Sequence, residues 1–439
     1  MANLKAFKGY RYNKEKIEDI GKQVSPPYYN LNSYDKEFLY KVSQYNSVRL
    51  FCGKNYDDDT EENNRFTRAA NYLHQWIESG VMKRDSEEAI YMYEQVMDVD
   101  NVQYSNRSFV GLVELEKLGE GDIMTCEEIR EVSRQDRYDF LTATNADLSM
   151  VSCLYVEREK DLFNLMNKIA EQTPETEFES TDGIIHRVWV ITDKTTIDFI
   201  IEKFKDLPLY ITDGQTRYET CLQYRDYMKA NNPNHTGKEP YNYTMVSLMN
   251  SRADGIAVLP VHRAVKLRKP FKLDYFVSAS QDHFKIEKII VDHGDDSIVD
   301  TMRKQIATKR KDTRIAMYCG EDFFYRMTLK DKDFIKQNIC PDMSEDYCNL
   351  DTVVLNKLVL KDILMLKDED FEDVVVLERN ANKCFDGVAE GEYSAMFVLN
   401  PVKIEQIRRV TANGEKMPTK TIGVYPKPAV GVVINIKED

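Results

Sequence analysis

The sequence lacks the segments that would place a chain in a membrane or send it through one. No run of about 18 consecutive apolar residues occurs, which excludes a membrane-spanning helix. The first twelve residues are polar, contain Lys5, Lys8 and Arg11, and have no apolar core, so they do not form a secretory signal. We therefore expect a cytoplasmic protein without a membrane partner.

Cysteine motifs are absent as well. The eight cysteines are scattered, no Cys-x-x-Cys pair occurs, and none lies near histidine at the spacing of a zinc finger. Disulfides are rare in the cytosol, where thiols are kept reduced. We therefore expect neither a disulfide scaffold nor a zinc site, and we expect all eight thiols to be reduced.

Basic residues are fewer than acidic residues in this sequence. The chain has 60 Lys and Arg against 74 Asp and Glu, a formal net charge of −14. Such a surface repels the phosphates of nucleic acids, and no basic run with interleaved aromatic residues offsets this. We expect no nucleic-acid partner, whereas a small anion held by a few local Arg and Lys side chains is compatible with the charge.

Two common nucleotide-binding motifs are missing. Gly53-Lys54 and Gly237-Lys238 lack the earlier glycine of a Walker A loop, and no dinucleotide-binding glycine fingerprint is found. These absences favour a phosphate ligand that carries no nucleoside.

What the sequence does contain is ordinary globular composition, with 42% hydrophobic and 31% charged residues. Its 439 residues are long enough for two or three domains. We expect an N-terminal α/β region over 1–115, a core region over 116–268 and a C-terminal α/β region over 269–439. No linker rich in Gly, Ser or Pro marks these boundaries, which are therefore approximate.

Apolar periodicity predicts a mixed α/β (α+β) fold, because strand and helix patterns alternate. In the first region we expect a helix over 61–79 and two strands, 89–93 and 109–113, joined by a polar turn around 101 and 105–106. In the second region we expect strands over 151–156, 188–191, 209–212 and 243–248, and helices over 160–171, 195–205 and 217–228. In the third we expect helices over 296–308 and 350–366, a hairpin of 314–317 with 323–327, and a strand over 431–436.

One strand–turn–helix segment has the features of a phosphate site. An apolar strand ends at Asp213-Gly214, and a helix then begins with Arg217 in its first turn. A glycine lets a phosphate approach the positive end of a helix closely. Arg217 can bind phosphate oxygens bidentately, and Asp213 can bind Mg²⁺. The alternative is a turn in which the aspartate only caps the helix and the arginine is solvated.

Longer strings carry a family resemblance. The pattern Ile211-x-Asp213-Gly214-x-x-Arg217-Tyr218-Glu219-Thr220 resembles the pyrophosphate-dependent serine kinase family, and its Gly-x-x-Arg box resembles that of the ParB and sulfiredoxin superfamily. Further strings match that family in order over nearly the whole chain: 24–28 (VSPPY), 46–50 (NSVRL), 91–95 (YMYEQ), 136–137 (DR), 142–149 (TATNADLS), 186–189 (HRVW), 259–263 (LPVHR), 417–420 (MPTK) and 425–427 (YPK).

The resemblance implies a ParB/sulfiredoxin-like catalytic core in the second region and a Mg²⁺-dependent kinase of free L-serine. The reaction would convert pyrophosphate and L-serine into O-phospho-L-serine and phosphate. Asp213 would act in catalysis and as the metal ligand. The donor phosphates would be bound by Gly214, Gln215, Thr216, Arg217, His262 and Arg263, and the substrate by Arg137, Tyr218 and Glu219. For the histidine at 262, a packed side chain in the core is the alternative.

A general base for the serine hydroxyl is also implied by the resemblance. The family places a glutamate in a Pro-His-Glu context upstream of the glycine box, and the corresponding string here is Met124-Thr125-Cys126-Glu127-Glu128. Glu127 is the matching residue, or Glu128 if the register differs by one. A positioned carboxylate can take the hydroxyl proton during phosphoryl transfer.

Gln215 and Thr216 are the chief departure, because the family has His-His at these positions. Both side chains can donate hydrogen bonds to phosphate, but neither can carry a positive charge. Two alternatives therefore stay open: a nucleotide-dependent serine kinase, and a catalytically altered paralog that acts as a ligand-binding or regulatory protein. Lys420 and Lys427, each near prolines, are further candidates for an anion-binding loop, although solvated lysines are the commoner outcome.

Overall fold

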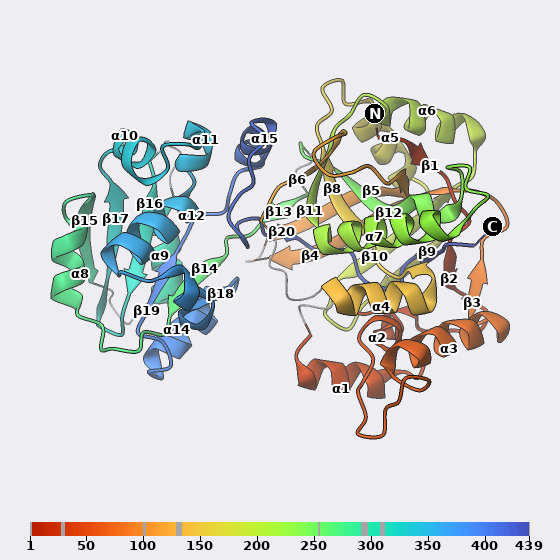
Figure 1. Cartoon of the computed structure of the whole chain (residues 1–439), viewed down its shortest axis with the longest axis horizontal. Helices are drawn as coiled ribbons and strands as arrows, with labels where there is room; N and C mark the ends of the chain where they lie inside the picture. Colours follow the sequence, from red (N-terminus) through yellow and green to blue (C-terminus); the bar gives the residue numbers. More distant parts are fainter. Residues whose placement is uncertain are drawn as a thin grey trace. The chain divides into compact units, whose positions relative to one another are not determined.

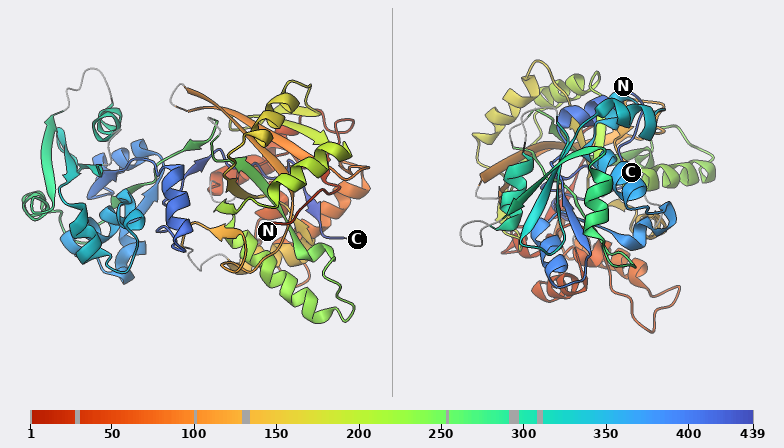
Figure 2. Two further views of the ribbon diagram at one scale, coloured as in Figure 1. Left: turned by 90° about the horizontal axis from the view of Figure 1, so that it is seen from above. Right: turned by 90° about the vertical axis from the view of Figure 1, so that its left-hand side faces the viewer.

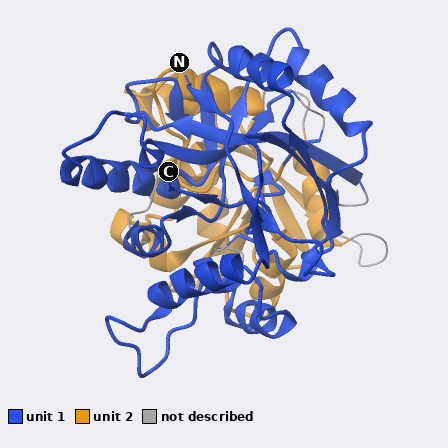
Figure 3. Cartoon of the chain, turned by 90° about the vertical axis from the view of Figure 1, so that its right-hand side faces the viewer, with its two compact units in different colours: residues 1–125, 129–257, 424–439 blue, residues 126–128, 258–423 orange. Residues whose placement is uncertain are grey.

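The structure is a computed structural model that describes residues 2–27, 31–99, 102–128, 134–252, 255–290, 297–307 and 312–438. The chain forms two compact units (Figure 3). Unit 1 comprises residues 1–125, 129–257 and 424–439, and unit 2 comprises 126–128 and 258–423. Helices and mixed sheets occur together in the fold, which confirms the expected mixed α/β class. In the part of the chain described, no helix is both long and apolar enough to cross a bilayer.

Unit 1 is built on a nine-stranded sheet (Figure 1). Its order is β6-β11-β8-β12-β5-β4-β10-β9, with β1 also paired to β5. The pairs β6/β11 and β8/β12 are parallel and the others antiparallel. The strands are β1 (Leu4–Lys5), β4 (Ile90–Val99), β5 (Val102–Glu114), β6 (Ile123–Thr125), β8 (Val151–Tyr155), β9 (Thr176–Glu179), β10 (Ile185–Ile191), β11 (Leu209–Asp213) and β12 (Tyr243–Asn250). The sheet thus joins strands from the expected N-terminal and core regions.

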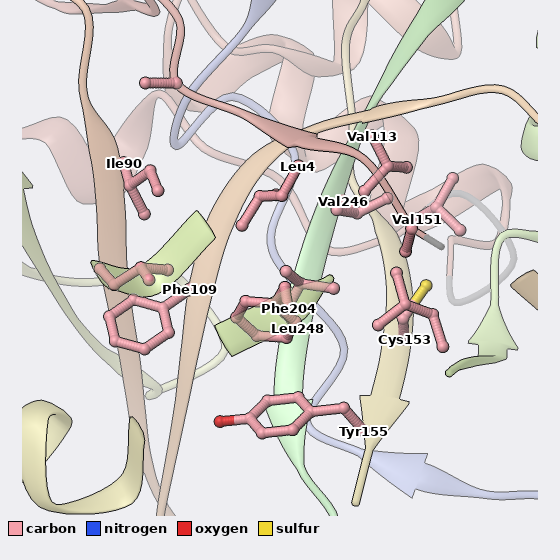
Figure 4. Packing of buried hydrophobic residues seen from close by; sticks show 14 of the residues in the cluster. Leu4, Ile90, Phe109, Val113, Val151, Cys153, Tyr155, Phe204, Val246 and Leu248 are labelled. Atoms are coloured by element: carbon pink, nitrogen blue, oxygen red, sulfur yellow. The ribbon is translucent and has the colours of Figure 1, made fainter. Parts of the chain in front are cut away.

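The two faces of this sheet are buried by different helices, which can be followed in Figures 1 and 2. Alternate residues of a strand point to opposite faces, so Ile90 and Met92 join one core while Tyr91 and Tyr93 join the other. Figure 4 shows the first core, to which strands β1, β4, β5, β8 and β12 contribute. Helices α5 (Asp161–Ala170), α6 (Lys194–Phe204) and α7 (Gln215–Asn231) pack there. The second core contains α1 (Ser33–Val42), α2 (Val48–Phe51), α3 (Arg65–Glu78) and residues 429–434.

The local elements expected in unit 1 are confirmed with small shifts. The two strands near 89–93 and 109–113 are the antiparallel hairpin β4–β5, in which residues 105–106 continue β5 and are not part of the turn. The turn residues 100–101 lie outside the described residues, as does position 28 of the 24–28 string. Helix α3 begins later than expected, because the Asn64 side chain accepts hydrogen bonds from the backbone N–H groups of residues 66 and 67. Helix α4 (Arg134–Thr144) lies against α3 and α7.

The C-terminal segment belongs to unit 1. Strand β21 (Asn435–Ile436) pairs with β7 (Ala146–Asp147), and isolated bridges join Ile434 to Tyr10 and Val430 to Ser25. The strand expected over 431–436 is therefore confined to its last two residues. Strands β2 (Tyr10–Tyr12) and β3 (Met82–Arg84) form a further pair, and β13 (Ala257–Val258) and β20 (Val424–Tyr425) lie where the chain passes between the units.

Unit 2 is built on a six-stranded antiparallel sheet of order β15-β17-β16-β19-β14-β18. Helices α9 (Ile298–Ile306) and α14 (Ala381–Ala389) pack on one face, while α8 (Leu273–Ser280) reaches the other through Phe276, whose ring lies 6.0 Å from that of Phe397. The strands are β14 (His262–Val265), β15 (Phe284–Ile290), β16 (Arg314–Tyr318), β17 (Phe323–Leu329), β18 (Val375–Glu378) and β19 (Ala395–Val398). The remaining α-helices are α10 (Lys332–Phe334), α11 (Glu345–Cys348), α12 (Asp351–Val353), α13 (Phe371–Val374) and α15 (Ile404–Ala412).

Two elements expected in unit 2 are confirmed, and a third differs in kind. The expected hairpin is formed by β16 and β17. The helix expected over 296–308 is α9. The end residues of that prediction, 296 and 308, lie outside the described residues. The helix expected over 350–366 begins as α12 but continues as a π-helix, Val354–Ile363. It ends before Met365, whose left-handed backbone (φ 57°) cannot continue a helix.

The expectation of eight reduced thiols is wrong for two of them. Cys340 follows a π-helical turn (Ile335–Ile339) and Cys348 ends α11; their Cα atoms are 6.2 Å apart and a disulfide joins them. The other six cysteines, all within the described residues, form no disulfide. The pair was not predictable from spacing, because only the folding of the intervening seven residues brings the two thiols together.

Candidate functional site

Asp213 lies where β11 ends and its ladder with β8 loses register. Ile211 pairs with Cys153, but Asp213 pairs with Ser152, so Thr212 is an extra residue in β11. Such bulges re-aim side chains and are common beside functional sites. The hydroxyl of Thr212 donates to the carbonyl of Ser152 at 3.3 Å, which holds the irregular segment in place. The strand, turn and helix expected around Asp213 are all present.

Gly214 is required at the turn for two reasons. Its φ of 82° is left-handed, a conformation that glycine adopts without strain, and it forms the N-cap of α7. A Cβ at this position would lie 2.6 Å from Nη2 of Arg217. The guanidinium group of Arg217 therefore lies directly over the glycine, at the start of a 17-residue helix.

Two cations hold the carboxylate of Asp213. Arg217 Nη2 donates to Oδ2 at 2.9 Å, and the ammonium group of Lys427 contacts Oδ1. The side chains of Lys427 and Asp213 are only 7% and 11% exposed. Gln95 Nε2 donates to the carbonyl of Lys427 at 3.1 Å and so fixes the backbone that carries this lysine. Two positive charges, one negative charge and a helix N-terminus together make a local centre that attracts anions.

A small cavity of about 50 Å³ adjoins Arg217 within unit 1. Arg137 also lines it, and Nη1 of that residue donates to the carbonyl of Phe51 at 3.4 Å. The cavity therefore brings the expected donor-binding residue Arg217 and the expected substrate-binding residue Arg137 to one place. Its full lining is Phe51, Arg137, Phe140, Leu141, Ala146, Asp147, Leu148, Ser149, Arg217, Thr220, Cys221 and Thr244.

Asp147, in the cavity wall, is bound to the C-terminal segment. Its Oδ2 accepts from Lys437 Nζ at 3.0 Å, from Asn435 Nδ2 at 2.8 Å and from the backbone N–H of Met245 at 3.1 Å. The side chains of Lys437 and Asp147 are 0% and 4% exposed. The carboxylate is thus neutralised from inside the protein.

The other expected residues of the 213–220 segment have partners within unit 1. Gln215 Nε2 donates to Glu219 at 3.2 Å, and Glu219 forms an ion pair with Arg134 at 3.0 Å. The carbonyl of Thr216 accepts from a hydroxyl one helical turn later. Tyr218 is fully buried and does not line the cavity. Its hydroxyl group accepts a hydrogen bond from the backbone N–H of Glu116 and donates one to the carbonyl of the same residue, both at 2.9 Å.

The expected general-base residues, Glu127 and Glu128, belong to unit 2. The Oε1 atom of Glu127 accepts the backbone N–H groups of Thr421, at 2.7 Å, and Ile422. Glu128 is exposed, and its backbone N–H donates to the carbonyl of residue 417 at 2.9 Å. The two hydrogen bonds to Glu127 hold the loop at 421–422 in place. The Glu128 side chain, in contrast, faces solvent.

His262 and Arg263 lie at the start of β14 and are completely buried. The backbone N–H of Leu399 donates to Nδ1 of His262 at 3.2 Å, and burial lowers the pKa of this histidine to about 3. The guanidinium group of Arg263 donates to the carbonyls of Val261 and Lys420. Both side chains thus bond to backbone groups of unit 2.

The residues at Asp213 fit Mg²⁺ only together with a phosphate ligand. Among the residues described, no three or more His, Cys, Asp or Glu side chains gather in a group that could hold a metal ion. Asp213 offers a single carboxylate whose two oxygens already face Arg217 and Lys427. Because Mg²⁺ is usually held by one or two carboxylates together with substrate phosphates and waters, Asp213 would be the protein ligand and the substrate would complete the shell.

Sequence reasoning gave too little weight to Lys427 and missed Lys437. The prolines on either side of Lys427 marked an ordered loop, which was the available signal. Lys437 carried no such signal, because its partner Asp147 is 290 positions earlier in the chain.

Comparison with known proteins gave a family and distant structural likenesses. Residues 4–353 match the family described as "Protein of unknown function (DUF1015)". No curated protein matches the sequence. Similar solved structures include a conserved hypothetical protein from Pyrococcus furiosus (12% identity, 74% of this chain, 94% of that one, TM-score 0.33) and a free serine kinase in complex with AMP (11%, 74%, 90%, 0.32). A third is SbnI with a C-terminal truncation from Staphylococcus aureus (11%, 74%, 87%, 0.36). TM-scores this low support no inference about activity.

Proposed function

The chain belongs to the DUF1015 family, whose description assigns no activity, and we propose that it is a phosphotransferase that phosphorylates free L-serine with pyrophosphate. The observation that carries the proposal is the Asp213 carboxylate held between Arg217 and Lys427, at a glycine turn that opens helix α7. In the proposal, residues 116–268, most of which belong to unit 1, supply a ParB/sulfiredoxin-like core.

The turn supports phosphate binding in a chain that is acidic overall. The net charge of −14 disfavours anions in general, so a phosphate needs local cations. Arg217 and Lys427 supply two, and the first backbone N–H groups of α7 point outward from its N-terminus. Gly214, Gln215, Thr216 and Arg217 are our proposed donor-binding residues. Pyrophosphate needs no pocket for a base or ribose, and the chain has neither a Walker A loop nor a dinucleotide fingerprint.

Phosphoryl transfer depends mainly on positioning and on charge stabilisation. Arg217 and Lys427 would bind donor oxygens and stabilise the charge that develops on the leaving phosphate. Asp213, between them, would face the reacting phosphoryl group, and bound Mg²⁺ would add further neutralisation of phosphate charge. A carboxylate must also take the hydroxyl proton of serine, and the assignment of Glu127 to this role stays a prediction. The donor roles of His262 and Arg263 and the substrate roles of Tyr218 and Glu219 stay predictions too.

A second candidate is a ligand-binding or regulatory protein without turnover. The observation that favours it is the side chain of Gln215, which stands where the resembled kinases have a histidine and whose amide nitrogen bonds Glu219 within the helix. In that case the same cations would bind a phosphate compound but no transfer would follow.

A donor panel tests the proposal. The full chain is incubated with Mg²⁺, L-serine and either pyrophosphate, ATP or ADP, and O-phosphoserine is quantified by mass spectrometry, with Asp213→Asn as the negative control. We expect product with pyrophosphate. Equal or greater yield with ATP or ADP would reassign the donor to a nucleotide.

Failure of all three donors would exclude the serine kinase. Thermal stabilisation by pyrophosphate or O-phosphoserine in that case supports the second candidate. A mobility-shift assay with DNA at low salt completes the comparison, and we expect no shift.

A further inference from the structure

We propose that strand β15 of unit 2 is an interaction surface for a second copy of this chain. The second copy would add its own β15 antiparallel to the first and so join two six-stranded sheets into one. The length of this edge strand, the direction of its backbone groups and the order of its charges support the proposed dimer, which does not depend on the proposed function.

β15 is the longest terminal strand of the two large sheets (Figure 1). It has seven residues, whereas the terminal strands β6, β9 and β18 have three, four and four. Its pairing with β17 runs from Phe284 to Ile290 without a bulge, and it contains neither proline nor glycine. Proteins usually protect a sheet edge with a short strand, a proline or a bulge, because an open edge can pair with another chain. β15 has none of these three protections.

The backbone groups of every second residue of β15 point away from β17. The N–H of Lys330 donates to the carbonyl of His283 at 2.9 Å, so residue 283 faces β17. Leu329, opposite Phe284, instead donates its N–H toward β16, to the carbonyl of Thr313 at 3.0 Å. Because an antiparallel ladder alternates, the N–H and C=O groups of 284, 286, 288 and 290 face outward. Between described residues, no backbone hydrogen bond outside the β15–β17 ladder uses these groups, and an added strand would pair with them.

The charges of β15 select one register for that pairing. Outward groups must meet outward groups, so a symmetric antiparallel pair is centred on a residue that lies opposite its own copy. Centring on Lys285, Glu287 or Lys288 places like charges directly opposite each other, which destabilises a sheet. Centring on Ile286 places Lys285 opposite the partner's Glu287, and Glu287 opposite the partner's Lys285. Ile286 is the only one of residues 285–288 whose register opposes lysine to glutamate.

The two charged side chains already lie on the same face of the sheet. Nζ of Lys285 is 3.4 Å from Oε1 of Glu287, and the two side chains are 69% and 32% exposed. Oε2 of Glu287 accepts from Nη2 of Arg326 at 2.9 Å, which orients the carboxylate. In the register centred on Ile286, the opposed lysine and glutamate form a pair without backbone hydrogen bonds, with Cα atoms about 4.5 Å apart. Lysine at an edge normally opposes pairing, but here each Lys285 would reach a carboxylate of the partner.

The centre of the proposed pair is apolar. Ile286 is half-buried and would contact its own copy on the other face of the sheet, where β-branched residues pack well. The outward groups of Phe284, Ile286 and Lys288 would form about six backbone hydrogen bonds with the second strand. We therefore expect a reversible dimer whose population depends on protein concentration.

Analytical ultracentrifugation of the full chain over a range of concentrations tests this association. We expect a monomer–dimer equilibrium. Ile286→Pro removes an outward N–H at the centre of the proposed pair and no donor of the ladder with β17, and proline is tolerated on the outward side of an edge strand. It should raise the dimer Kd at least tenfold while circular dichroism shows unchanged strand content.

Two charge variants test the register. Lys285→Glu and Glu287→Lys each place like charges opposite one another in a symmetric dimer, so each should raise the dimer Kd by roughly tenfold or more. An equimolar mixture of the two should form a mixed dimer, because one variant is then acidic at both positions and the other is basic at both. Lys383→Glu is the matched control, since it makes the same charge change at an exposed residue of α14 in the same unit. It should dimerise like the unmodified chain.

A crosslink tests the register without changing these charges. In the proposed pair the two copies of residue 286 have Cα atoms about 5.5 Å apart, within the range of a disulfide. Mild oxidation should therefore crosslink Ile286→Cys chains into dimers. Lys288→Cys should not crosslink, because residue 288 lies opposite the partner's Phe284 and not opposite its own copy.

Several outcomes would overturn the proposal. A chain that stays monomeric at every concentration would do so, as would a dimer whose Kd is unchanged in both Ile286→Pro and Lys285→Glu. A mixture of the charge variants that associates no better than either variant alone would contradict the register when both variants are folded. If Glu287→Lys unfolds through the loss of its pair with Arg326, crosslinking of Lys288→Cys in place of Ile286→Cys would overturn the register instead. None of these results depends on turnover, so the proposed phosphotransferase is tested separately.

Discussion

Lys427 and Asp213 form a buried ion pair across 214 positions of sequence, with the lysine ammonium group on Oδ1 of the aspartate. Arg217 holds the other oxygen from the first turn of α7. The C-terminal segment thus supplies one of the two cations at the turn that we propose binds the donor.

Replacing Lys427 tests the contribution of this pair. Lys427→Met should lower the free energy of unfolding by about 2–3 kcal/mol, because a largely buried carboxylate loses a charged partner. Urea unfolding measures the change. Adding Asp213→Asn should recover part of the loss, since the buried charge is then removed as well. Strictly additive effects of the two substitutions would contradict an energetic coupling between these residues.

Gly214→Ala tests the close contact between the turn and Arg217. The substitution should cost about 1–2 kcal/mol for a left-handed alanine and should also displace the guanidinium group, so pyrophosphate binding should weaken. Gly183→Ala is the matched control, because its φ of 79° imposes similar strain while its Cβ would meet nothing within 4 Å. Calorimetry with pyrophosphate should separate the two variants. If both bind pyrophosphate equally well, the contact with Arg217 has no role in the site.

Arg217→Ala should chiefly affect the donor. The loss of a bidentate charged contact should weaken pyrophosphate binding by about 2 kcal/mol or more, roughly 30-fold in Kd. Arg217→Lys keeps the charge but not the planar fork, and should fall between the alanine variant and the unmodified chain. An alanine variant with unchanged pyrophosphate affinity would move the donor site away from this turn.

Glu127→Gln and Glu128→Gln decide the general base. Glutamine keeps an oxygen for the backbone N–H groups of Thr421 and Ile422, so Glu127→Gln should fold normally. If Glu127 is the base, turnover should fall by roughly 10²–10⁴-fold in a steady-state phosphoserine assay while Glu128→Gln stays active. The reverse result would assign the role to Glu128, and full activity in both would remove it from either residue.

His186 should make the protein less stable in mild acid. It is buried between the Tyr93 hydroxyl (2.7 Å from Nδ1) and the Ser180 hydroxyl (2.8 Å from Nε2), and burial lowers its pKa to about 3. An unfolded histidine titrates near pH 6.5, so between about pH 6.5 and 3 the unfolded chain binds the extra proton. The stability contribution is therefore complete above pH 6.5 and decreases as the pH falls, by up to about 1.4 kcal/mol per pH unit.

Urea unfolding between pH 7.5 and 4.5 should show this slope, and His186→Gln should reduce it. His262 in unit 2 acts in the same direction, because burial lowers its pKa to about 3 as well. Asp351 acts oppositely, since burial raises its pKa to about 6, and its cost to stability increases as the pH rises from about 4 to 6. An unchanged slope in His186→Gln would show that the histidine is not kept neutral in the folded state.

Local patterns predicted the parts of the fold that nearby residues determine. The apolar run 89–93 gave strand β4, and the Asp213–Gly214 turn gave the start of α7 within two residues. The orientation of Arg217 toward Asp213 follows from their spacing of four positions, which a single turn brings together.

Long-range pairing was not predictable in the same way. The pairing of β5 with β12 and of β4 with β10 joins regions that were expected to be separate, and no local signal specifies which strands become neighbours. The same limit applies to Lys427 and Lys437, whose carboxylate partners are 214 and 290 positions away. Charge and hydropathy suggest solvated lysines at both positions, and only the folded chain shows that they are buried.

The return of residues 424–438 to unit 1 also has a consequence for the order of synthesis. A ribosome makes the strands of the large sheet first, then the whole 258–423 segment, and only afterwards the residues that complete the second core and neutralise Asp147 and Asp213. During that interval the face of the nascent sheet that bears Tyr91, Val110 and Met245 lacks part of its cover. Unit 2 emerges in one nearly continuous stretch, so the later-made unit can finish folding before the last sixteen residues of unit 1 have been made.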